Sequence, residues 1–285
     1  GVRVILVSHT GEIVGSEERK TALTEDFRME QSPDSWWNSV LECLQVIMHS
    51  LPKEFDLHNI KAISVTSTSG TVIPLDIQNR PLHPALMYSD NRQEEEGKLC
   101  RETAISHNPE GYTAFNSSSG LSKILWYIRT YPEKILEIHT WVHATDYIIG
   151  KLSGNFRTTD FTNALKSGYD ITHNRWPSYI YEILPIHKNW LQEVVPSGTP
   201  IGYLSIELSK LLGLSSIQIV AGMTDGCASQ VASGAVNPGD WNTTIGTTLV
   251  IKGVTKTEIK DPEGRLYCHR HPLLQSVTPP YPVPQ

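Results

Sequence analysis

Residues 217–234, IQIVAGMTDGCASQVASG, join an apolar run to a stretch of small residues through one acidic residue, Asp225. The apolar run is typical of a buried strand, and the stretch from Gly226 onward predicts a helix. In sheets whose strands alternate with helices, ligands bind outside the carboxyl ends of the strands. Asp225 therefore lies where a functional residue is expected, although a simple helix N-cap explains the same position from the residues alone.

A second polar stretch, NTTIGTTLVI at residues 242–251, contains Gly246, Thr247 and Thr248. Glycine permits a tight turn, and amide and hydroxyl groups in such a turn can hold phosphate oxygens without a charged side chain. An ordinary β-hairpin turn explains the same residues without a ligand. The chain contains neither G-x-x-x-x-G-K-[ST] nor G-x-G-x-x-G, so the sequence excludes the Walker and Rossmann phosphate sites as usually written.

Composition limits the class of protein. The chain has 285 residues, of which 39% are hydrophobic and 19% charged, and this predicts a globular protein with one large domain or two. A net charge of -6 without a basic cluster argues against a nucleic-acid partner. No apolar run approaches ~18 residues, so no membrane span is expected. The four widely spaced cysteines predict free thiols in the cytoplasm.

Strand and helix patterns alternate along the rest of the chain. Residues 2–20 have the pattern of a hairpin, and 60–70 and 71–82 have the pattern of strands. Ser32-Pro33-Asp34 predicts a helix start before an apolar stripe, and further helices are expected at 123–129 and 141–152. This alternation predicts an α/β architecture.

The order of several motifs is more specific than any one of them, and it resembles the FGGY carbohydrate kinases. The matching segments are SVTSTSGTVIPLD (64–76), HPALMYSDNRQ (83–93), SKILWYIRTYPE (122–133), WVHATDYIIGKLSG (141–154), TDFTNALKSGYD (159–170) and LQEVVPSGTPIG (191–202). The resemblance covers residues 1 to about 270. It implies the RNase-H-like fold of the actin/hexokinase-like ATPases, with a first domain at 1–222 and an incomplete second domain at 223–285.

The resemblance also implies a reaction. The family phosphorylates a sugar hydroxyl with ATP and Mg²⁺, and Asp225 matches the catalytic base of that reaction. Gly246, Thr247 and Thr248 match a turn that faces the ATP phosphates. Among family members the chain looks closest to the ribulokinase and xylulokinase branch, so D-ribulose is expected as the substrate before D-xylulose. A homodimer is compatible with this assignment.

Other residues are expected on the sugar side of the site. Ser69, Gly70 and Thr224 match polar positions of the sugar-binding loops, and a solvated Ser/Thr loop is the alternative for the first two. Asp90 is expected either to bind sugar hydroxyls or to form a salt bridge with Arg92.

Several polar residues are expected to have structural roles. Asp146 is expected to cap or brace its helix, and Asp160 and Asn163 either shape the sugar pocket or form an Asx turn. Glu94–Glu96 and the cluster His269–His271 are expected on the surface. The spacing of these residues gives no metal site.

The chain departs from the family pattern at four places. It lacks the opening D-x-G-T phosphate loop, the stretch after Arg270 does not match, and the later Gly-rich adenosine segment is missing; Gly120 stands where the family usually has Pro, Ser or Thr. We expect that the residues given are part of a longer kinase. The alternative is a sugar-binding or regulatory module of the same fold without catalytic activity.

Overall fold

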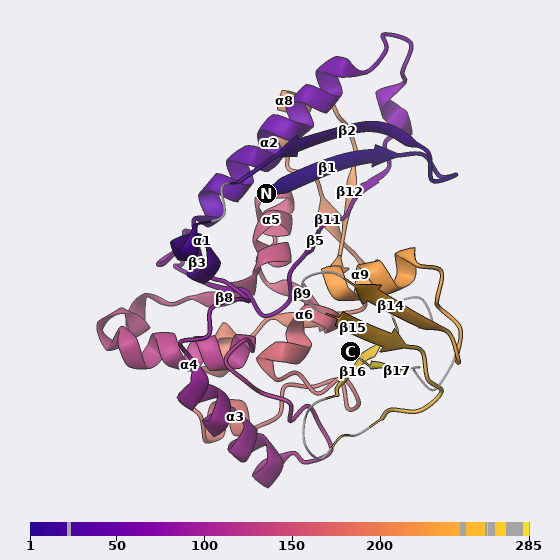
Figure 1. Ribbon diagram of the computed structural model, residues 1–285. Helices are drawn as coiled ribbons and strands as arrows, with labels where there is room; N and C mark the ends of the chain where they lie inside the picture. The colour runs from indigo at the N-terminus through magenta and orange to yellow at the C-terminus, as the bar shows by residue number, and fades with distance from the viewer. Residues whose placement is uncertain (22–23, 246–248, 260, 262–265, 272–281, 285) are drawn as a thin grey trace.

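The computed structural model describes residues 1–21, 24–245, 249–259, 261, 266–271 and 282–284. Figure 1 shows strands and helices alternating along this chain, as the sequence predicts for an α/β protein. The α-helices described are α1 Glu25–Met29, α2 Pro33–Ser50, α3 Glu94–His107, α4 Gly120–Thr130, α5 Ala144–Ser153, α6 Phe161–Ala164, α7 Tyr179–Glu182, α8 Ile206–Leu212 and α9 Asp225–Ala232.

The strands and 3-10 helices between them are short. The strands described are β1 Val2–Val7, β2 Ile13–Arg19, β3 Glu30–Gln31, β4 Ala62–Ile63, β5 Thr66–Ser67, β6 Val72–Leu75, β7 Ala85–Leu86, β8 Thr140–His143, β9 Thr158–Asp160, β10 Glu193–Val195, β11 Pro200–Tyr203, β12 Gln218–Val220, β13 Met223–Thr224, β14 Trp241–Ile245, β15 Leu249–Gly253, β16 Cys268–Arg270 and β17 Pro282–Pro284. The 3-10 helices are η1 Leu57–Asn59, η2 Pro132–Glu137, η3 Leu165–Ser167 and η4 Lys188–Trp190.

The N-terminal hairpin and the first long helix follow the sequence prediction. Strands β1 and β2 pair antiparallel, and α2 lies along them (Figure 1). The Ser32 hydroxyl caps α2 by accepting from the Ser35 amide, and Pro33 occupies the first turn, where its missing N–H costs nothing. Leu44 and Ile47 are buried on the inner face of the helix, as the apolar stripe predicts.

Two distant segments form parallel strand pairs at the centre of the fold. Residues 62–63 pair with 218–219, and residues 66–67 pair with 223–224. The single strands predicted at 60–70 and 217–223 are therefore interrupted. The interruption lies at a close backbone approach, because a Cβ on Gly222 would lie 1.7 Å from the Val65 carbonyl oxygen. Only glycine fits at this position.

The helix predicted at 141–152 begins three residues later than expected. Residues Thr140–His143 form strand β8, which pairs antiparallel with β6 and is buried along its whole length. A run that is buried on both faces has no alternating pattern, so the sequence does not separate it from the helix that follows. The expected end is confirmed, since Gly154 terminates α5 in the left-handed conformation.

The buried apolar side chains form two main clusters. One contains Leu44, Ile73, Tyr147, Ile149, Leu152, Leu208, Ile217 and Ile219, and it joins α2, α5 and α8 to the parallel strands. The other contains Val72, Leu86, Leu121, Leu125, Tyr127, Ile128, Trp141 and Ile180, and it joins α3 and α4 to β6–β8. All four cysteines are buried free thiols, as the sequence predicts.

Candidate active site

Asp225 begins helix α9 directly after strand β13. Its side chain is exposed, whereas the preceding residue Thr224 is 1% exposed and forms the N-cap of the helix. One oxygen of the Asp225 carboxylate accepts from the Gly226 amide at 2.7 Å. The cap position therefore belongs to Thr224, and the Asp225 carboxylate is open to solvent at the carboxyl end of a strand.

The loop with Ser69 and Gly70 reaches the same edge of the sheet. Because β5 runs parallel to β13, with Ser67 opposite Thr224, the segments that follow the two strands leave the sheet side by side. Gly70 has a φ of +81°, and a Cβ there would lie 2.3 Å from the Ser118 carbonyl oxygen. Glycine is required at this point for both its conformation and the space.

A buried hydrogen-bond chain supports the N-terminus of α9. The Thr224 amide donates to the Thr162 hydroxyl at 2.8 Å, and that hydroxyl donates to the carboxylate of Asp160. Asp160 also accepts from the Thr162 amide and from the side chain of Asn163, so it is the N-cap of α6. Burial raises the pKa of Asp160, although these hydrogen bonds oppose the shift. The expected Asx turn at Asp160 is present, and its role here is to support Thr224.

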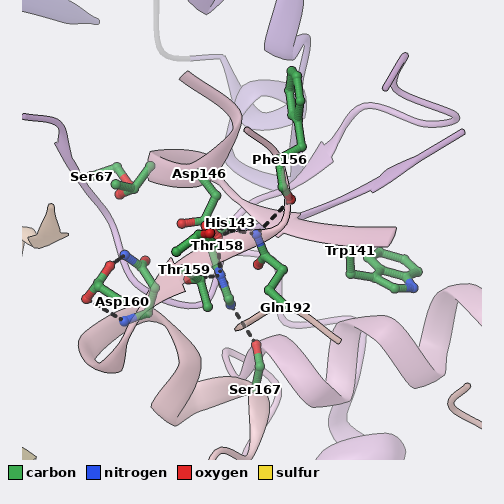
Figure 2. A network of polar contacts seen from close by, with 12 residues as sticks. Ser67, Trp141, His143, Asp146, Phe156, Thr158, Thr159, Asp160, Ser167 and Gln192 are labelled. Carbon is green, nitrogen blue, oxygen red and sulfur yellow. Dashed lines mark hydrogen bonds and ion pairs between the residues drawn. The ribbon is translucent and has the colours of Figure 1, made fainter. Parts of the chain in front are cut away.

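A second polar network lies behind this edge of the sheet. Figure 2 shows the His143 ring between Asp146 and Ser167. Nδ1 of His143 lies 2.7 Å from the Asp146 carboxylate and so donates to it, which leaves Nε2 to accept from the Ser167 hydroxyl at 2.8 Å. The backbone amide of His143 also donates to Asp146 at 2.9 Å, which confirms the predicted bracing role of that carboxylate at the start of α5. The network fixes η3, which carries Lys166.

Lys166 belongs to the same region, although the sequence reasoning did not single it out. It is half-buried, and its Nζ lies 5.5 Å from the centroid of the Tyr267 ring. Burial lowers the pKa of Lys166, while the nearby charge of Asp225 opposes the shift. No hydrogen-bond acceptor for this ammonium is found among the described residues. Its position as the one basic residue in TDFTNALKSGYD was the signal available in the sequence.

Asp90 is placed in the interior. Its side chain is 0% exposed, and its oxygens accept from Arg92 at 2.8 and 2.9 Å and from Gln93 at 2.8 Å. Burial by itself would raise the pKa of Asp90, but the hydrogen bonds from Arg92 and Gln93 outweigh it and hold the pKa below its ordinary value. Asp90 thus braces the turn, and a direct contact with a sugar stays a prediction.

The expected phosphate turn, Gly246, Thr247 and Thr248, lies outside the described residues. On either side of it, β14 and β15 pair antiparallel from Trp241–Gly253 to Ile245–Leu249. The two strands form a hairpin next to α9 (Figure 1).

Two expectations about surface residues are wrong. Glu96 is buried and forms an ion pair with Arg129 at 2.9 Å, while Glu94 and Glu95 are exposed as expected. His269 is 1% exposed because β16 packs against α6, and burial with the nearby Lys166 and Lys252 lowers the pKa of His269 to about 3. Cys268 and His269 are consecutive and both buried, and His271 is buried as well, so this short strand has no alternating pattern that its sequence could have shown.

In the part of the chain that the structure describes, no group of three or more His, Cys, Asp or Glu side chains is arranged to hold a metal ion. Within the same residues, none of the helices combines the length and apolar character that a bilayer crossing needs.

Comparisons with known proteins identify the family of the chain. A model of the FGGY family of carbohydrate kinases, N-terminal domain, matches residues 1–232. The chain is 25% identical over 285 residues to a xylulose kinase of Escherichia coli, with 96% of this chain and 56% of the relative covered. It is 26% identical over 273 residues to a gluconokinase of Bacillus licheniformis, with 94% and 52% covered. The chain thus spans about half the length of these relatives.

Solved structures show the same fold. A xylulose kinase from Rhodospirillum rubrum superposes with a TM-score of 0.86 at 24% identity and covers 99% of this chain and 57% of that one. The glycerol kinase of Plasmodium falciparum with ADP superposes with a TM-score of 0.81 at 22% identity, with 99% and 58% covered. The predicted α/β fold class is confirmed. With the family model covering most of its length, the chain belongs to the FGGY family of carbohydrate kinases.

Proposed function

We propose that this chain is part of an ATP-dependent kinase that transfers the γ-phosphoryl group to a hydroxyl of a pentulose. The observation that carries the proposal is the exposed carboxylate of Asp225 at the end of β13, beside the loop of Ser69 and Gly70. Lys166 adds a half-buried ammonium in the electrostatic field of that carboxylate. A carboxylate, an ammonium and a polar loop at one edge are groups that can bind and orient a hydroxyl-rich substrate.

In the proposed reaction Asp225 accepts the proton of the sugar hydroxyl. The hydroxyl oxygen forms the new bond to phosphorus, the bond from phosphorus to the ADP oxygen breaks, and the proton moves to the carboxylate. Phosphoryl transfer has a loose transition state, so positioning matters more than basicity. An exposed aspartate is therefore sufficient as the base, and the buried support from Thr224, Thr162 and Asp160 holds its helix in place.

ATP and Mg²⁺ are proposed as the phosphoryl donor and its metal. Mg²⁺ keeps several waters and binds through phosphate oxygens with one or two carboxylates, so it does not require a cage of protein ligands. The described residues contain no such cage, and we assign none of them to the metal. Gly246, Thr247 and Thr248 are proposed to hold ATP phosphates, and ADP in the related Plasmodium falciparum glycerol kinase supports a nucleotide in this family.

The identity of the sugar is the most specific part of the proposal. D-ribulose is preferred over D-xylulose because the loop Ser69-Gly70-Thr71 and the segment NALKSGYD resemble the ribulokinase and xylulokinase branch. Relatives named xylulose kinase and gluconokinase support a small sugar or sugar acid as the acceptor.

We also propose that the chain is divided into a sugar-binding domain at 1–222 and a nucleotide-binding domain from 223. A cytoplasmic location is proposed as well, and the free cysteines support it.

The test is a coupled assay of ADP release with pentuloses, hexuloses, pentitols, glycerol and aldonates, on the natural gene product and on Asp225→Asn. We expect activity with a pentulose, and the substitution should lower kcat by roughly 10²–10⁴-fold because general-base catalysis contributes about that factor. Sugar binding, measured by calorimetry, should change only a few-fold. Glu207→Gln, an exposed carboxylate on α8, is the matched control and should behave as wild type.

The outcomes separate the two candidate functions. Unchanged turnover in Asp225→Asn would end the assignment of the base. Sugar binding without ADP release in the wild type would favour the alternative, a sugar-binding or regulatory module of the same fold.

A further inference from the structure

Lys252 is a buried lysine that contacts the first turns of helix α9. It lies on strand β15 and is 6% exposed. Its Nζ donates to the Gly226 carbonyl oxygen at 2.8 Å and to the Ser229 hydroxyl at 2.6 Å. Gly226 directly follows the candidate base, Asp225. Lys252 is therefore a direct link between the β14–β15 hairpin and the helix that carries Asp225.

The two faces of the described hairpin strands carry different side chains. Trp241, Ile245, Leu249 and Ile251 are 61%, 82%, 62% and 51% exposed. Since side chains alternate along a strand and Thr243 lies opposite Ile251, these four share one face. Lys252 projects from the other face, toward α9. General burial preference does not explain a lysine at this place, because lysine is almost never fully buried unless its ammonium is paired.

Electrostatic attraction does not explain the burial of Lys252 against α9 either. The N-terminus of a helix carries partial positive charge, so an ammonium in its first turns is repelled. Lys252 has only neutral acceptors and no ion pair among the described residues. A buried ammonium without a carboxylate partner costs stability, and an apolar side chain of similar length is often neutral or stabilising in its place. Stability alone therefore gives no reason for a lysine rather than an apolar side chain at this position.

We propose that Lys252 is a positioning residue that fixes Asp225 relative to the β14–β15 hairpin. The inference rests on the proposed kinase function, because the hairpin strands flank the residues expected to hold ATP phosphates. Two hydrogen bonds from one ammonium, to the carbonyl of Gly226 and to the hydroxyl of Ser229, define both the distance and the rotation of α9. Small residues in α9 permit this close approach. Lys252 itself contacts neither sugar nor nucleotide in this proposal.

The experiment compares Lys252→Met, Ser229→Ala and the control Lys210→Met, an exposed lysine of α8, in the natural gene product. Lys252→Met should lower kcat by about 10–100-fold, since small misplacements of reacting groups have that effect, while KM for sugar and ATP changes less than about 3-fold. Ser229→Ala removes one of two acceptors and should lower kcat less. The Tm of Lys252→Met should be unchanged or higher, which a purely structural lysine would not give.

A second readout is independent of activity. Amide hydrogen exchange in residues 226–232 and 249–253 should become about 10-fold faster in Lys252→Met, and not in the control, because the link between the two elements is lost. Unchanged kcat, a rise in KM for ATP alone, or unchanged exchange would each overturn the proposal. If the wild type releases no ADP with any sugar, the proposed function fails by itself, and the exchange measurement still decides whether Lys252 couples β15 to α9.

Discussion

Gly120→Ala tests whether the hydrogen bond between His143 and Ser167, behind the candidate site, requires glycine at position 120. A Cβ at Gly120, the first residue of α4, would lie 2.4 Å from the Ser167 hydroxyl oxygen and 3.1 Å from Cγ1 of Val72. The hydroxyl would have to rotate away, and it would then lose its hydrogen bond to Nε2 of His143. This steric conflict also explains why the position holds glycine.

The magnitude follows from the group that is left unpaired. A buried ring nitrogen without its donor costs about 1–3 kcal/mol. Alanine is the better helix former by about 0.5–1 kcal/mol in a helix interior, and by less in the first turn. The net loss in the free energy of unfolding should therefore be about 1–2 kcal/mol, or a fall in Tm of roughly 2–6 °C for a chain of this size.

A double-mutant cycle in denaturant unfolding isolates this mechanism. Ser167→Ala alone should cost about 1–2 kcal/mol, because it removes the same hydrogen bond. When Gly120→Ala is added to Ser167→Ala, the extra cost should fall below about 0.5 kcal/mol, since only a small shift of Val72 is still needed. Equal costs of Gly120→Ala in both backgrounds would refute the reasoning.

Two further predictions concern the core. Gly222→Ala should prevent folding of the parallel strand region, since its Cβ would meet the Val65 carbonyl oxygen at 1.7 Å, and native-like circular dichroism with full stability would contradict this. Burial lowers the pKa of Lys123 from 10.5 to about 7, so between these values the unfolded chain binds more protons and stability gains as pH rises. Compared with Lys123→Met, the wild type should become relatively more stable from pH 7 to pH 10.5 in chemical denaturation; a constant difference would argue against it.

The sequence predicts those parts of the fold whose cause is local. The Ser32-Pro33 start of α2, the glycine end of α5 and the first hairpin depend on residues close in the chain, and all three are confirmed. The strand at Thr140–His143 was missed because both of its faces are buried. The break at Gly222 was missed because its cause, the Val65 carbonyl, comes from a distant segment.

The same distinction between local and distant causes applies to the residues of the candidate site. The apolar run before Asp225 predicts that this residue lies at the end of a strand. The structure confirms this position, and the Asp225 side chain is exposed there. The ion pair of Asp90 with Arg92 was one of the two alternatives expected at that turn, and it is present. The burial of Glu96 could not be predicted, because its partner Arg129 comes from a distant segment. Lys166 had a weak signal as the one basic residue of its segment, whereas Lys252 is a single lysine in a strand and has none. Only the fold brings each of them near α9.

The parallel pairing of residues 62–67 with residues 218–224 also has a consequence for biogenesis. Roughly 150 residues must be synthesised and brought together before this pairing can close, and such long-range closure is slow. Until then the first of these strands has an open edge on the nascent chain, where it can pair with the wrong partner. The need for chaperones during translation should therefore depend on how soon residues 218–224 leave the ribosome.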